Sequence, residues 1–142
     1  MPSPPAPGIV LQRLKTRAEF LRVQKGRRHY MPGLTLELCP SPPNAMANSA
    51  VRVGFTASRK IGNAVARNRA KRRMRALAAE ILPLSGRTAC DYVLVARTAT
   101  LTRPFAQLRL DLQSALAAAH AALDKGGTDR ASSRTGREER YD

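Results

Sequence analysis

Residues 60–77, KIGNAVARNRAKRRMRAL, most restrict what this chain can fold into. Six of the nine residues from Arg67 to Arg75 are cationic, and no acid follows before Glu80. At about 100° per residue, the apolar side chains of this region fall within one arc of about 80°: Ala66, Ala70, Met74, Leu77 and Ile81. The pattern predicts a helix from about Asn63 to Leu82, ended by Pro83, that packs one stripe against a core.

The rest of this helix surface carries one sign of charge. Arg67, Lys71 and Arg75 form one row, Asn68 and Arg72 lie on the far side, and Arg69 and Arg73 form the opposite border. Each like-charged pair one turn apart costs roughly 0.2–0.5 kcal/mol, and no acid is spaced to offset it. Arginine forks match phosphate oxygens. This face therefore indicates a polyanionic partner more than an ordinary solvated helix surface.

The charge of the whole chain supports that interpretation. The formal net charge is +15. From Asp124 onward, five bases balance five acids, so the preceding residues carry the entire excess. Such a compact cation indicates nucleic acid first and an anionic membrane surface second.

Hydrophobic patterning predicts the remaining elements. Thr16 and Glu19 form a T-x-x-E capping box that begins a helix over residues 17–25. Residues 27–33 are interpreted as a linker and 39–50 as a loop. Apolar alternation or a continuous apolar run predicts three strands, at residues 34–38, 51–58 and 90–96. A last helix is expected to 123, with Thr102 as N-cap and Pro104 in its first turn.

This order predicts an α+β protein, a small two-layer α/β sandwich with the order α-β-β-(β)-α-β-α. We expect one domain over residues 13–123, a disordered N-terminus over 1–12 and a disordered, neutral tail over 124–142. No apolar run approaches the roughly 18 residues of a membrane span, and the first ten residues do not resemble a signal peptide. The prediction is a soluble, cytoplasmic protein.

Candidate catalytic groups are sparse. His29 and His120 lie in unrelated segments, and the acids of the folded region occur singly, so neither a two-histidine nuclease nor a metal cluster is indicated. Cys39 and Cys90 are interpreted as buried thiols. Ahead of the basic helix, Ser58-Arg59-Lys60-Ile61-Gly62-Asn63 forms a turn in which Asn63 can cap the helix. Free N–H groups at that end can take a phosphate, but the turn is not a Walker loop. The sequence predicts a protein that binds and does not catalyse.

The segment RVGFTASRKIGNAVARNRAKRRMRAL resembles the bacterial ribonuclease P protein component. The matching residues are Arg52-Val53-Gly54, Ser58-Arg59-Lys60, Gly62 to Val65, Arg67-Asn68-Arg69, Lys71-Arg72 and Arg75. The resemblance extends to Arg13-Leu14-Lys15 and Glu19-Phe20 upstream, and to Asp91-Tyr92-Val93 and the final helix downstream. It covers roughly residues 12–120.

The resemblance implies a fold like domain 2 of ribosomal protein S5, with a left-handed βαβ crossover. It implies a one-to-one partnership with a catalytic RNA that, with Mg²⁺, removes the 5′ leader from precursor tRNA. The protein itself would hold no catalytic residue, cofactor or metal. The RNA-docking residues would be Ser58, Arg59, Lys60, Asn63, Arg67, Asn68, Arg69, Lys71, Arg72, Arg73 and Arg75. A cleft between the sheet and the first helix would hold the leader through Phe20, Arg52 and Thr56.

Two positions depart from the family pattern. Gln24 stands where a second aromatic ring is frequent, and Glu37 would oppose a leader phosphate. Phe20 also has an alternative role as a core residue. Two alternative functions stay open, a general basic protein that binds RNA, DNA or lipid and a nuclease that needs no RNA subunit. Membrane and DNA partners are not expected.

Overall fold

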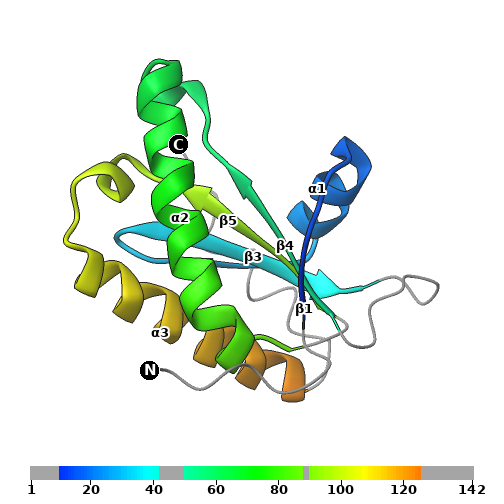
Figure 1. Ribbon diagram of the computed structural model, residues 1–142. Helices are drawn as coiled ribbons and strands as arrows, with labels where there is room; N and C mark the ends of the chain where they lie inside the picture. Colours follow the sequence, from blue (N-terminus) through cyan, green and yellow to red (C-terminus); the bar gives the residue numbers. More distant parts are fainter. Residues whose placement is uncertain (1–9, 42–49, 88–89, 126–142) are drawn as a thin grey trace.

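The computed structural model describes residues 10–41, 50–87 and 90–125, which form one five-stranded sheet with three helices (Figure 1). The strand order is β1-β4-β5-β3-β2. Their bounds are β1 Val10–Arg13, β4 Ala50–Thr56, β5 Cys90–Ala96, β3 Leu34–Pro40 and β2 Arg27–Tyr30. β1, β4 and β5 are parallel, whereas β3 runs antiparallel to β5 and β2 antiparallel to β3.

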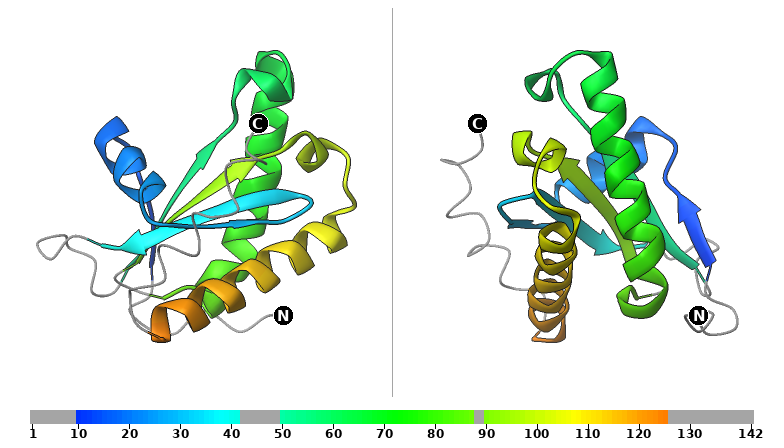
Figure 2. Two further views of the ribbon diagram at one scale, coloured as in Figure 1. Left: turned by 180° about the vertical axis from the view of Figure 1, so that it is seen from behind. Right: turned by 60° about the vertical axis from the view of Figure 1, so that its left-hand side comes forward.

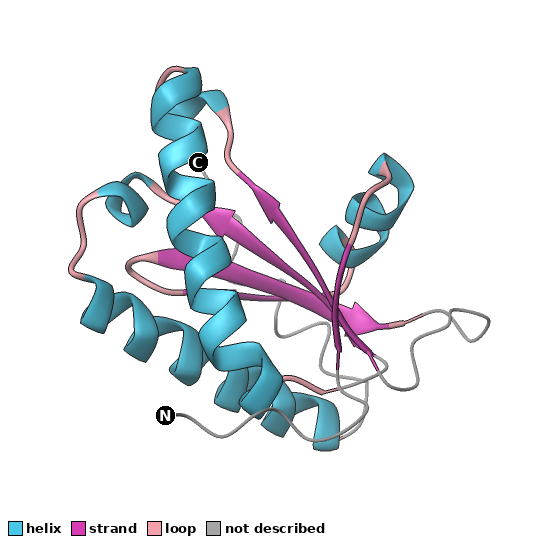
Figure 3. Cartoon of the chain, viewed as in Figure 1, coloured by secondary structure: helices cyan, strands magenta, loops and turns pink. Residues whose placement is uncertain are grey.

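The helices divide between the two faces of the sheet (Figures 1 and 2). α2 (Ala64–Ser85) and α3 (Phe105–Asp124) cover one face, and the shorter α1 (Arg17–Gln24) covers part of the other. Two 3₁₀ helices, η1 (Arg59–Ile61) and η2 (Thr98–Leu101), lie in the connections after β4 and β5 (Figure 3). The expected α+β architecture is confirmed, and α1 adds partial cover on the second face.

The β4-α2-β5 crossover is left-handed, as the family resemblance implies. In Figure 1, α2 lies in front of the sheet, both strands point up and to the left, and β5 lies on the left of β4. About 98% of such crossovers have the opposite hand, so periodicity and composition alone do not predict this connection.

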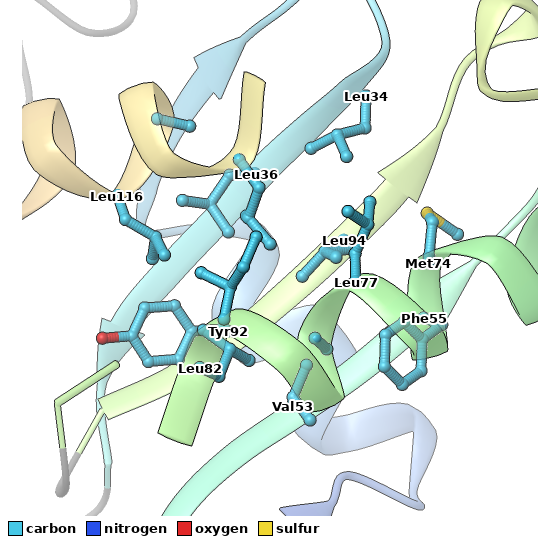
Figure 4. Close-up of a cluster of buried hydrophobic side chains, with 14 of the residues drawn as sticks. Leu34, Leu36, Val53, Phe55, Met74, Leu77, Leu82, Tyr92, Leu94 and Leu116 are labelled. Atoms are coloured by element: carbon cyan, nitrogen blue, oxygen red, sulfur yellow. The ribbon is translucent and has the colours of Figure 1, made fainter. Parts of the chain in front are cut away.

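The main core lies between the sheet and the pair α2 and α3 (Figure 4). Leu34, Leu36 and Leu38 of β3 are fully buried there, which confirms the predicted apolar face. β5 is covered on both faces, as its continuous apolar run predicts. Tyr92 and Leu94 join the main core, whereas Val93 belongs to a smaller cluster on the α1 side.

Two edge strands were not predicted from the sequence. Residues 27–30, interpreted as a linker, form β2 along β3, and residues 10–12, assigned to a disordered terminus, belong to β1 along β4. Each has four residues, too few for an alternation of its own, and owes its strand form to pairing with a longer neighbour. Most of the predicted loop at 39–50 and of both predicted disordered ends lies outside the described residues.

Two helix boundaries also differ from the prediction. α2 continues past Pro83 to Ser85, because Ile81 and Leu82 are buried and hold the last turn on the core. α3 begins at Phe105 with Pro104 at its N-cap, since the residue before a proline avoids helical geometry. Thr102 is therefore not the N-cap of α3. It closes η2 instead.

Candidate nucleic-acid interface

The connection from β4 into α2 is a capped, exposed turn. The Ser58 hydroxyl accepts a hydrogen bond from the Lys60 backbone N–H at 3.3 Å, and Asn63 Oδ1 accepts one from the Ala66 N–H at 2.9 Å. Gly62 between them has φ 143°, a conformation that L side chains rarely adopt. Ser58, Arg59, Lys60 and Asn63 are all exposed. The predicted turn and the predicted cap are confirmed.

The amphipathic geometry of α2 is as the sequence predicts. Ala70, Met74 and Leu77 are fully buried in the stripe that faces the core. The polar side chains of the outer face point away from it. Arg69, Arg72, Arg75 and Asn68 are exposed, and Arg67 and Lys71 are half-buried at the border.

All acids of the described residues pair with arginines outside α2. The ion pairs are Glu19–Arg52, Glu37–Arg28, Glu80–Arg109, Asp91–Arg22 and –Arg52, Asp111–Arg103 and Asp124–Arg87. Within residues 10–41, 50–87 and 90–125, no carboxylate is therefore left within ion-pair distance of the outer face of α2. That face, defined here by Arg67, Asn68, Arg69, Lys71, Arg72 and Arg75, keeps its charge uncompensated.

Arg73 does not belong to this outer face, although the sequence suggests it. Its guanidinium donates to the backbone carbonyls of Thr100 at 2.7 Å and Arg103 at 2.8 Å, and it lies 5.9 Å from the centre of the Phe105 ring. Both acceptors lie next to or within η2, about thirty residues further along the chain. Arg73 thus fastens the η2–α3 connection to α2, and its predicted contact with RNA stays a prediction.

On the opposite face of the sheet, Phe20 of α1 packs its ring over Gly54 of β4. A Cβ at Gly54 would come within 2.5 Å of the Phe20 ring, so glycine is needed at that position. Phe20 is half-buried and packs against the small cluster of Leu14, Val23, Cys39 and Val93. The ring is therefore partly a packing residue and keeps one part of its surface accessible. Thr56, also half-buried, pairs in register with Val95.

Arg52, the third residue predicted for the leader cleft, is engaged within the protein. It is 8% exposed, and its guanidinium lies 2.6 Å from Glu19 Oε2 and 3.5 Å from Asp91 Oδ1. Its partners lie far away in the sequence, so spacing does not show that Arg52 is already paired. In the free protein the Arg52 guanidinium therefore serves two ion pairs, and its direct contact with RNA stays a prediction.

A hollow of about 460 Å³ lies on the face of the sheet that α1 partly covers, here called the α1 face. Val95 joins the two regions, because it lines the hollow and also packs against the cluster beneath α1. The hollow is lined by residues of the sheet and of the η1 and η2 connections: Arg28, Tyr30, Thr35, Glu37, Ser58, Lys60, Ile61, Val95, Ala96, Arg97 and Thr98.

Sequence reasoning missed Arg28, Tyr30 and Arg97 in this hollow. Arg28 and Tyr30 lie two apart on β2, a spacing that places both side chains on one face once residues 27–30 are recognised as a strand. Tyr30 supplies an aromatic ring on this face of the sheet, where Gln24 takes the place of a ring that is frequent in the family. Burial raises the pKa of Glu37, and Arg28 at 2.9 Å partly offsets this and compensates the charge. Glu37 therefore faces a cation of its own chain.

The histidines and cysteines among the candidate catalytic residues are half-buried or buried. The Tyr92 hydroxyl and His120 Nε2 lie 2.7 Å apart, and burial lowers the pKa of His120. Burial and nearby Arg27 lower the pKa of His29. Cys39 and Cys90 are buried free thiols, as expected, and burial raises the pKa of Cys39 to about 11. Among the described residues, no three His, Cys, Asp or Glu side chains form a metal-binding group, and no helix is long and apolar enough to cross a bilayer.

Residues 10–120 match the family model for ribonuclease P. The chain is 46% identical over 107 residues to the ribonuclease P protein component of Paramagnetospirillum magneticum, covering 75% of this chain and 80% of that protein. It is 43% identical over 120 residues to the one of Caulobacter vibrioides, covering 84% and 78%.

Solved structures give the same result. The RNase P protein of Staphylococcus aureus superposes with a TM-score of 0.61 at 27% identity, covering 75% of this chain and 94% of that one. The RNase P protein of Thermotoga maritima has a TM-score of 0.61 at 24% identity, covering 74% and 94%, which supports the fold alone.

Proposed function

The chain belongs to the ribonuclease P protein family, whose members assist an RNA subunit in tRNA 5′ processing, and we propose how its two faces divide that work. It is part of a tRNA-processing ribonuclease, and this function is supported over that of a general basic binder. In our proposal, the outer face of α2 docks on the RNA subunit, and the α1 face of the sheet receives the 5′ leader of the precursor.

The uncompensated outer face of α2 carries the first half of the proposal. In the free protein its cations repel one another, and phosphates would turn that repulsion into attraction. The turn residues Ser58, Arg59, Lys60 and Asn63 lie at the N-terminus of the same helix and extend the surface. One copy of such a face fits one site on one RNA subunit. Arg73 supports this surface from behind and does not contact RNA.

The second half rests on the α1 face. A single strand would pass Phe20, continue over Thr56 and Val95, and enter the hollow beside Tyr30 and Lys60. Base stacking on an aromatic ring contributes roughly 1–3 kcal/mol for each base and tolerates any sequence. Two separated rings and a cation suit a leader that is bound without strict sequence preference.

We assign phosphodiester hydrolysis to the RNA subunit. His120 and the acids of the described residues are engaged in hydrogen bonds or ion pairs within the fold, and His29 is half-buried. The described residues also do not gather a ligand set that fits Mg²⁺, so this ion would be held by RNA. We also propose a cytoplasmic location, where tRNA precursors would be met.

Reconstitution tests the proposal. Purified protein, freed of nucleic acid, would be combined with the RNA subunit, and 5′ cleavage of precursor tRNA would be followed at low Mg²⁺. We expect no cleavage by protein alone, cleavage by the complex, and a lower KM for a precursor with a long leader than with a one-nucleotide leader. Cleavage by protein alone would favour the RNA-independent nuclease. Equal affinity for unrelated duplex DNA would favour the general basic binder.

A further inference from the structure

α1 has little of its own to hold it in place. It has eight residues, and isolated helices shorter than about 12–15 residues are marginal in water. Its apolar contacts are those of Val23 and Phe20 with a small cluster, separate from the main core on the other side of the sheet. The wall of the proposed leader path therefore needs a second means of attachment.

Asp91, on the central strand β5, supplies it. Its side chain is 1% exposed. Asp91 Oδ2 lies 3.2 Å from Arg22 Nη1, and Oδ1 lies 3.5 Å from Arg52 Nε and accepts a hydrogen bond from the Ser41 hydroxyl at 2.6 Å. A buried carboxylate is tolerated only when such partners stay in place. The position of Arg22 on α1 is thus tied to the middle of the sheet.

The first turn of α1 is tied to the same carboxylate through Arg52. Arg52 Nη2 donates to Glu19 Oε2 at 2.6 Å. The other oxygen of Glu19 accepts the backbone N–H groups of Lys15 at 2.7 Å and Thr16 at 3.0 Å, as part of the capping box. One carboxylate therefore both begins the helix and connects it to the sheet.

The last turn is held by Arg22, which also donates to Cys39 Sγ at 3.2 Å and to the Pro40 carbonyl. α1 is consequently fixed at two points, one on each side of Phe20. Between them, the Phe20 ring lies on Gly54. Because the two ion-paired residues flank the ring, they determine its height and angle above the sheet.

We propose that Glu19, Arg22, Arg52 and Asp91, here called the α1 anchor, are positioning residues for the leader. They set the distance between Phe20 and the sheet, and hence the width of the path into the hollow. They act through Phe20 and do not contact the leader. The inference rests on the proposed function of the α1 face.

A purely structural role is the alternative, and the chain offers a matched control. Asp111 is also buried, at 6% exposed, and pairs with Arg103 at 2.8 Å while accepting the Gly33 N–H at 2.9 Å. It lies on α3, on the opposite face of the sheet. Asp111→Asn removes a comparable buried charge and leaves the α1 face untouched.

The decisive variant is Glu19→Gln. Glutamine serves in a capping box as glutamate does, so the helix start is kept and only the ion pair with Arg52 is lost. Asp91→Asn tests the centre of the anchor. Each variant, with Asp111→Asn beside it, would be reconstituted with the RNA subunit, and KM and kcat would be measured for precursors with a long leader and with a one-nucleotide leader.

For both anchor variants we expect KM with the long leader to rise about three- to tenfold, with kcat unchanged and no change for the short leader. Asp111→Asn should leave the ratio of the two KM values at the wild-type level. If wild type does not distinguish the leaders, the leader proposal itself fails. Two results would overturn the anchor inference when wild type does distinguish the leaders. One is that Glu19→Gln keeps the wild-type ratio of the two KM values, and the other is that its KM rises equally for both leaders. Should Asp91→Asn not fold, Glu19→Gln decides alone.

Discussion

Arginines serve opposite purposes on the two faces of this molecule. On the outer face of α2 they are exposed or half-buried, and none lies within ion-pair distance of a carboxylate of the described residues. On the α1 face, Arg22, Arg28 and Arg52 each pair with a buried or half-buried acid. Residue type alone does not separate the two groups. What separates them is where the six acids of the described residues are placed, because each of these pairs with an arginine away from the outer face.

The comparison predicts different costs for losing an arginine. Arg52→Ala leaves Asp91 and Glu19 short of a partner, and removing one member of a buried ion pair costs about 3 kcal/mol or more. We expect that loss in the free energy of unfolding, measured in urea. Arg72→Ala, from the outer face, should change it by no more than about 0.5 kcal/mol. Equal losses would show that the two faces are not distinct.

The outer face should dominate RNA binding. Replacing Arg69, Arg72 and Arg75 together by alanine should weaken binding to the RNA subunit about a hundredfold at low salt. Each lost phosphate contact lowers the slope of log K against log salt by roughly 0.7–0.9, so the slope should fall by about two. The free protein should become slightly more stable, as like-charge repulsion is relieved. An unchanged slope would remove the outer face from the RNA interface.

Arg73 sharpens the comparison, because it follows Arg72 in the sequence but is bonded within the protein, as the arginines of the α1 face are. Arg73→Ala should lower the free energy of unfolding by about 1.5 kcal/mol through lost charge-assisted hydrogen bonds to two carbonyls. The salt slope of RNA binding should stay at the wild-type value. Arg72→Ala should lower the salt slope and leave the free energy of unfolding almost unchanged. A lowered slope in Arg73→Ala would place its guanidinium in the RNA interface after all.

The smallest effects concern two glutamates on the α1 face. The pKa of Glu19 is lowered, first by the backbone N–H groups of Thr16 and Lys15, so its stabilisation is present above pH 4.5 and lost as pH falls through the folded pKa. The pKa of Glu37 is raised by burial, so its contribution is present below pH 4.5 and lost as pH rises through the folded pKa.

Unfolding in urea between pH 3 and 7 checks both signs. The stability cost of Glu19→Gln should shrink as the solution is acidified. The free energy of unfolding of Glu37→Gln should increase relative to that of wild type as the pH rises. Parallel pH profiles for the two variants would contradict the assigned pKa directions.

The sequence predicts those features whose determinants lie close together along the chain. The α2 stripe, the Asn63 cap, the Thr16–Glu19 capping box and the alternating leucines of β3 all follow from spacings of a few residues. Features that depend on distant partners were missed. β1 and β2 exist because longer strands lie beside them, and Arg22 meets Asp91 across 69 residues. Distance along the chain also hid the ion pairs of Arg52 and the hydrogen bonds of Arg73.

The placement of β1 and β2 has a mechanical consequence for α1. These strands lie at opposite edges of the sheet, about 19 Å apart at about 4.8 Å per strand. Residues 14–26 must cross that width, and the eight-residue helix spans only about 12 Å of it. The five other residues of this connection can extend over about 17 Å more, so chain length alone leaves α1 free to move and the α1 anchor has to hold it in place.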